Sequence, residues 1–122
     1  MIKISKNNLK SKNKPDYLKM ANELLESVSK ESDIETTNKG YVTNSYLRNI
    51  LEISRKVDNI DEFFLRIGYM TAKNLSNEIN ENIDFYNKLK KMVYEKNFNM
   101  EMISELMEYT IMKFNVMKKL EG

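Results

Sequence analysis

Apolar residues recur at spacings of three and four along most of the chain, which is the period of an amphipathic helix. Polar stretches separate five such segments, at about residues 15–30, 44–57, 60–79, 83–96 and 99–120. No stretch of convincing length alternates apolar and polar residues with the period of two that marks a strand. The pattern therefore predicts an all-α protein, a compact bundle of about five helices with short connections.

The boundaries of these segments carry helix-start and loop signals. Pro15 and Asp16 suit a first helical turn. Thr43 suits an N-cap, because its hydroxyl can accept a hydrogen bond from a backbone N–H two or three residues on. Residues 31–42 lose the helical period and gain Asp, Thr, Asn and Gly, so we expect a loop there. Residues 80–82 predict a shorter break.

The size of the chain and its two ends predict one domain with a basic extension. With 122 residues, of which 41% are hydrophobic, we expect a single helical domain over 15–122. Residues 1–14 hold five lysines and no acidic residue, which predicts a flexible basic arm. Such an arm can attract nucleic acid, but a solvated terminus in a lysine-rich chain is the simpler explanation.

The residue types that are missing exclude most catalytic and metal chemistry. The chain has no Cys and no His, which excludes a Ser-His-Asp triad, a cysteine nucleophile and the common zinc sites. Acidic pairs such as Glu101 and Glu105 lie at helical spacing on a face expected to be solvated, without a second acidic cluster. We therefore predict no catalytic residue, no metal site and no cofactor.

Two features predict a location in the cytoplasm. No apolar run reaches the length of a transmembrane helix, so we expect no membrane partner. The first fourteen residues lack the apolar core of a signal peptide.

The arginines form a candidate binding surface. Only three of the twenty basic residues are arginine. In the second predicted helix Arg48 and Arg55 are seven residues apart, and in the third Arg66 and Lys73 have the same separation, so each pair shares a helix face. If the two helices pack side by side, the rows predict one polar strip. Its members are Lys39, Thr43, Asn44, Ser45, Arg48, Arg55, Arg66 and Lys73.

Such a strip has the chemistry that binds a phosphodiester backbone, through guanidinium groups, amides, hydroxyls and a helix N-terminus. Spacing alone favours a plainer interpretation. Arg48 has Glu52 four residues on, and Arg66 has Glu62 four residues before it, so surface ion pairs account for both arginines.

Three segments resemble one protein family. Residues 43–51, TNSYLRNIL, resemble the start of a helix in the small subunit of the type III-A CRISPR effector, the Csm complex. RIGYM at 66–70 is similar to that family's Arg-Ile-Ala-Tyr-Leu segment. The tail from Met102 to Leu120, which contains MEYTIMKFNVMKKL, is similar to its closing helix. The order of the segments also agrees, over roughly residues 16–120.

The resemblance implies a non-catalytic part of a ribonucleoprotein that acts in antiviral defence. Copies of the subunit would stack along a filament and touch the backbones of guide RNA and target RNA without reading their sequence. The implied partners are both RNAs, the RNA-binding backbone subunit, the large subunit and further copies of the chain itself. Arg48 and Arg66 are the implied RNA contacts. The matched motifs also include Thr43, Asn44, Ser45 and Tyr69.

The chain departs from the family pattern at the far end of the third predicted helix. The family often carries further arginines after its Tyr-Leu pair, whereas Thr71 and Asn80 stand near those places here. The resemblance therefore gives no RNA contact at that end.

Two other functions stay open. The nine methionines predict mainly core filling, but methionine-rich faces also suit a helical protein-interaction or regulatory module that dimerises and does not bind nucleic acid. A small acid–base enzyme using Asp, Glu, Lys, Tyr or Arg is the weaker alternative.

Overall fold

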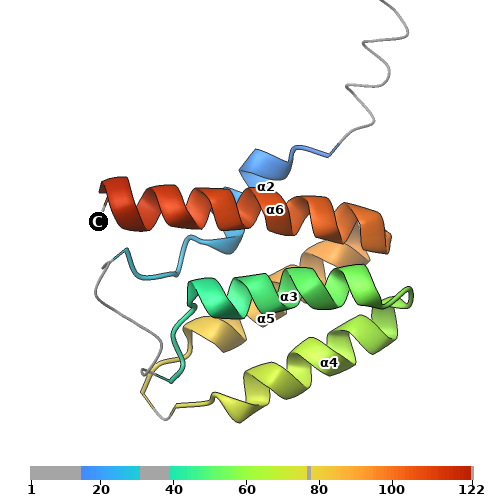
Figure 1. Cartoon of the computed structure of the whole chain (residues 1–122), viewed down its shortest axis with the longest axis horizontal. Helices are drawn as coiled ribbons and strands as arrows, with labels where there is room; N and C mark the ends of the chain where they lie inside the picture. Colours follow the sequence, from blue (N-terminus) through green and yellow to red (C-terminus); the bar gives the residue numbers. More distant parts are fainter. Residues whose placement is uncertain (1–14, 31–38, 77, 122) are drawn as a thin grey trace, which may run out of the picture.

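Five α-helices make up the part of the chain that the computed structural model describes, residues 15–30, 39–76 and 78–121 (Figure 1). They are α2 (Tyr17–Leu24), α3 (Asn44–Lys56), α4 (Ile60–Lys73), α5 (Glu81–Glu95) and α6 (Met100–Val116). A π-helical turn, η1 (Met117–Glu121), continues α6. The described residues contain no strand, so the predicted all-α class is confirmed. The predicted basic arm, 1–14, lies outside the described residues.

The second helix of the pattern, α3, has a central place in the bundle. It packs against α6 on one side and α4 on the other, and Figure 1 shows these three helices as successive rows. The short α2 packs on α6, and α5 packs on α4. Side chains on α3 therefore lie either toward α6, toward α4, or on the outer ridge between them.

The core consists of the apolar residues that define the helical period. Its largest fully buried side chains include Leu47 of α3, Phe63 and Ile67 of α4, Phe85 of α5 and Met107 of α6. Each lies on the inner face of its helix, where burial of apolar area supplies the main driving force for folding.

Among residues 15–30, 39–76 and 78–121, all but one of the methionines lie in the core or pack against it. Met92, Met107 and Met117 are buried, and Met70 and Met102 pack against the core from partly buried positions. The predicted core role is confirmed for these five. Met112 differs, because 57% of it is exposed on α6.

Two predicted helices are longer in the sequence pattern than in the structure. The first, predicted over 15–30, ends at Leu24, because the chain turns there and buries Leu25 and Val28 without further helix. The third, predicted to reach residue 79, ends at Lys73. Just beyond this end, the side-chain amide of Asn74 donates a hydrogen bond to the Met70 carbonyl. This bond gives a partner to one of the last carbonyl groups of α4, which have none within the helix.

The break predicted at 80–82 lies earlier in the chain. Helix α5 begins at Glu81, so Glu81 and Asn82 are helical and the connection runs from 74 to 80. The reason is tertiary. The Glu81 carboxylate accepts hydrogen bonds from the backbone N–H groups of Ser29 at 3.0 Å and Val42 at 3.2 Å, and the Asn82 N–H donates to the Gly40 carbonyl at 3.0 Å. These bonds fix the start of α5 and the approach to α3 together.

Candidate nucleic-acid interface

The N-terminal end of α3 faces a small polar hollow of about 190 Å³. Thr43 is the N-cap, as predicted, and its hydroxyl accepts from the Tyr46 N–H at 3.1 Å. No acidic residue lies in the first turn of α3, so the positive end of its dipole is not neutralised there. Lys39 and Ser45 line the hollow with Thr43, so the structure brings together these three predicted residues.

The predicted residues Asn44, Arg48 and Arg55 lie on the α6 side of α3. The Asn44 side-chain oxygen accepts from the Asn115 amide of α6 at 3.3 Å. The Arg55 guanidinium donates to the Glu108 carboxylate of α6 at 2.8 Å, and both side chains are about half exposed. Arg48 lines a shallow groove between the two helices, with Leu51, Glu52, Arg55, Glu108, Ile111 and Met112.

Arg48 has no ion-pair or hydrogen-bond partner among the described residues, so the predicted pair with Glu52 is not formed. Its exposed guanidinium is open to an external anion. The second predicted pair is confirmed. Arg66 contacts the Glu62 carboxylate one turn away on α4, at 2.8 Å from Nη2 and 2.9 Å from Nε.

The outer face of α4 carries a second candidate surface around Tyr69, which is 66% exposed. Arg66 precedes Tyr69 by three residues and Lys73 follows by four, so both neighbour it on the helix. The Lys73 ammonium lies 5.1 Å from the centroid of the Tyr69 ring, a cation–π distance. Leu65, 73% exposed, lies one turn away from Tyr69 on the same face.

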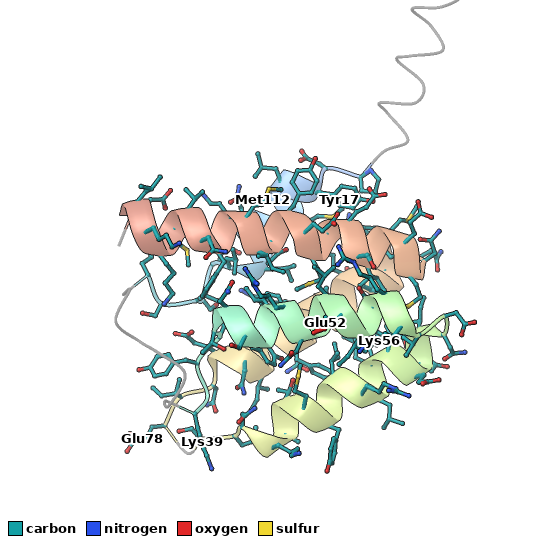
Figure 2. The ribbon with its side chains drawn as sticks, in the orientation of Figure 1. Tyr17, Lys39, Glu52, Lys56, Glu78 and Met112 are labelled. Atoms are coloured by element: carbon teal, nitrogen blue, oxygen red, sulfur yellow. The ribbon has the colours of Figure 1, made fainter. Side chains whose placement is uncertain are left out.

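The two rows of basic residues do not form the single strip that spacing predicted. Arg48 and Arg55 face the α6 side of α3, whereas α4 packs against the opposite side, where the Tyr46 hydroxyl lies 2.6 Å from the Thr71 hydroxyl. The outer ridge of α3 therefore separates the rows, and Figure 2 shows Glu52 on that ridge with Lys56. Helical spacing correctly predicted which basic residues share a helix face. It could not predict the side of α3 on which α4 packs.

Thr71 has a structural role that explains why no arginine stands there. It is buried, its hydroxyl donates to the Ile67 carbonyl at 2.7 Å, and it meets the Tyr46 hydroxyl in the core. An arginine in this position would bring an unpaired charge into the core, at high cost. Burial also raises the pKa of Tyr46 to about 12.

The acidic residues considered for catalysis are separated by their contacts. Glu108 pairs with Arg55, whereas Glu105 lies near the Tyr17 hydroxyl. Burial, followed by the charge of Glu105, raises the pKa of Tyr17 to about 12. Within residues 15–30, 39–76 and 78–121, no group of three acidic side chains is placed to hold a metal ion. None of the helices in these ranges is long and apolar enough to cross a membrane.

Tyr69 is the residue that the composition and charge pattern missed. Its signal in the sequence is an aromatic residue between two cations at helical spacing, inside the RIGYM segment. Only the structure shows that the ring lies outside the core.

No family model, no curated protein and no solved structure matches this chain. Its function is therefore inferred from its own residues and surfaces.

Proposed function

We propose that this chain is a non-catalytic small subunit of a type III-A CRISPR ribonucleoprotein effector. In this function it lies in the cytoplasm, contacts the backbones of guide RNA and target RNA, and leaves sequence recognition to base pairing. Copies of the chain stack along a filament with the backbone and large subunits, and their repetition supplies avidity. The three sequence segments that resemble the family support this assignment.

The RNA-binding part of the proposal is carried by the exposed Tyr69 between Arg66 and Lys73 on α4. The unstacked bases of single-stranded RNA stack on flat aromatic side chains, and neighbouring cations contact the phosphates. A large exposed ring on the outer face of a helix has no packing role in the fold, since α4 buries Phe63, Phe64 and Ile67 instead. The surface therefore suits an external partner.

Arg48 supplies a second contact from α3. Its guanidinium has no partner among the described residues, so binding a phosphate there breaks no ion pair. Arg66 differs, because its pair with Glu62 must be exchanged for a phosphate. The cost is small, since exposed ion pairs contribute at most about 1 kcal/mol.

The test replaces Tyr69 and compares it with its neighbour Leu65. In a binding titration of the full chain with a generic single-stranded RNA at low salt, Tyr69→Ala is expected to weaken binding roughly 5- to 100-fold, the range for loss of one base–aromatic stacking contact. Leu65→Ala is the matched control, because Leu65 is equally exposed on the same helix and lacks a π face. It is expected to bind like the unchanged protein.

Salt dependence gives the second measurement. Binding is expected to fall steeply between 50 and 200 mM salt, because phosphate contacts release counterions. The charge reversals Arg48→Glu and Arg66→Glu together are expected to flatten this dependence while the melting temperature stays nearly unchanged. If the chain, alone and with its effector subunits, does not associate with RNA at low salt, the proposal is wrong.

A protein-interaction module that dimerises without binding RNA is the second candidate. One observation favours it, the exposed apolar residues along α6, including Met112. This candidate predicts no salt-dependent RNA binding.

A further inference from the structure

Helix α6 is apolar on its outer face as well as on the face that packs in the core. The inner face buries Ile103, Leu106, Met107 and Phe114. On the outer side a row of apolar residues, here called the α6 ridge, continues into η1 and consists of Tyr109, Met112, Val116 and Leu120. Tyr109 stacks on Tyr17 of α2 and is 38% exposed, and the other three are more exposed. The spacings of three, four and four place these residues along one side of the helix.

Such a face is unusual at the edge of a bundle. A surface helix normally carries polar residues opposite its core stripe, and one that is apolar all round is normally buried. The α6 ridge includes Met112 at 57% and Leu120 at 80% exposure. Figure 1 shows α6 as the outermost of the three rows that it forms with α3 and α4, and Figure 2 labels Met112 on it. The ridge therefore has the character of a contact surface.

The charged residues beside the α6 ridge indicate which kind of partner surface is complementary to it. Glu101 and Glu105 lie in the N-terminal half of α6, and the exposed Lys119 lies at the C-terminal end in η1. Glu105 precedes Met112 by seven residues, and Lys119 follows Met112 by seven. If a second copy of the chain is rotated by 180° about the apolar centre, its basic end faces the acidic end of the first copy. The surface is therefore complementary to itself in the antiparallel orientation.

We propose that two copies of this chain pair through their α6 ridges, antiparallel, with the two-fold axis at Met112. In this arrangement each Met112 packs on its copy, and Tyr109 lies near Val116 of the other copy. Each Glu105 lies opposite Lys119 of the other copy. A two-fold pair uses the same patch on both subunits, which the symmetric spacing allows. A parallel pair would place Glu105 beside Glu105 and Lys119 beside Lys119, so like charges would repel.

The dimer is expected to be weak. Four exposed apolar side chains on one helix cover less than the roughly 800 Å² per partner of a standard stable interface. Association should therefore depend on protein concentration, with the monomer dominant in dilute solution. The pairing is inferred from residues other than those assigned to RNA contact, so it does not depend on the proposed function. Met112 lines the same groove as Arg48, so the dimer would cover that groove.

Cysteine cross-linking tests the two-fold axis directly, because the natural chain has no cysteine. With a mild thiol oxidant at high protein concentration, Met112→Cys is expected to give a covalent dimer. Leu65→Cys is the matched control, since it places a thiol at an exposed apolar position on α4, and it is expected to remain largely monomeric. Equal cross-linking of the two variants would overturn the proposal.

Charge exchange tests the antiparallel register. Light scattering and sedimentation should show a concentration-dependent dimer, weakened severalfold by Lys119→Glu or by Glu105→Lys and restored when both changes are combined. Because Glu105 contacts Tyr17, the helicity and melting temperature of each variant are measured alongside. A strictly monomeric protein at high concentration would overturn the inference. RNA titration of the same samples separates this result from failure of the proposed function.

Discussion

Arg48 and Arg55 have the same sequence signal and different surroundings. Both lie on the α6 side of α3, but Arg55 is held by Glu108 and Arg48 has no partner among the described residues. A neighbouring carboxylate reduces the attraction of an arginine for phosphate, because the phosphate must first displace the carboxylate. At the residue scale, the two predicted contacts are therefore unequal, and Arg48 is the one ready to bind an anion.

Removing the Glu108 charge should make Arg55 available. Glu108→Gln is expected to tighten RNA binding two- to fivefold at low salt and to steepen the dependence of log K on log salt by up to about one unit. Fold stability should change by less than about 1 kcal/mol, since the pair is exposed. The measurement is a binding titration at several salt concentrations.

Glu101→Gln is the matched control for that change. Glu101 is an exposed acid on the same helix, and the described residues give it no ion-pair partner. If both variants bind RNA equally well, Arg55 does not contact RNA and the gain comes from net charge alone.

At the element scale, α3 shows how local and distant residues share control of one helix. Thr43 caps it locally, but the direction from which the chain enters is set by Gly40. Gly40 has φ of +90°, and its carbonyl accepts from Asn82 at the start of α5. A Cβ on Gly40 would lie 2.1 Å from the Ile79 carbonyl oxygen, so no other residue fits this approach without displacing backbone.

Gly40→Ala is therefore expected to destabilise the fold by about 1–3 kcal/mol, from backbone strain and the clash with Ile79. Thermal unfolding followed by circular dichroism should show a melting temperature several degrees lower.

Gly68→Ala is the control, because Gly68 lies inside α4 with a helical backbone and its nearest neighbour is a side-chain atom, the Tyr86 hydroxyl at 3.0 Å, and not backbone. A near-normal melting temperature is expected for it. Equal melting of Gly40→Ala and the unchanged protein would refute the close approach of Gly40 to Ile79.

At the scale of the whole molecule, a polar group inside the core ties three helices together. The Tyr46 hydroxyl of α3 meets the Thr71 hydroxyl of α4 at 2.6 Å and donates to the Asn82 carbonyl of α5 at 3.3 Å. Asn82 is buried as well, and its amide donates to the Asn74 carbonyl. Hydrogen bonds between helices inside the core fix the relative positions of helices that apolar packing alone would leave less specific.

The raised pKa of Tyr46 predicts a loss of stability at high pH. Below pH 10 the folded and unfolded chains both hold the phenolic proton, so stability does not depend on it. Between pH 10 and about 12 the unfolded chain releases the proton and the folded chain does not, so the free energy of unfolding falls as pH rises. Urea unfolding at a series of pH values measures this decline, to which Tyr17 also contributes.

Tyr46→Phe distinguishes the contribution of this residue. It should lower stability by about 1 kcal/mol at neutral pH, through loss of the bond to Thr71, and make the alkaline decline shallower. An equally steep decline in the variant would show that Tyr46 is not the group responsible.

The helical period predicted the class of the protein, its five helices and most of its core, because burial of one helix face follows from residue spacing alone. It also predicted the N-cap at Thr43 and the pair of Arg66 with Glu62, since both depend on residues within one turn. Interactions of this short range depend only on residues that are close together in the sequence. The whole of α3 was therefore predicted almost to the residue.

Only the tertiary structure decided what depends on neighbours far apart in sequence. The start of α5 at Glu81 and the pairing of Arg55 with Glu108 both arise from such contacts. The sequence determined which residues share a helix face, whereas packing determined which neighbour each face meets. That is why α3 separates the two basic rows, and why Tyr69 and the α6 ridge remain exposed after the core is filled.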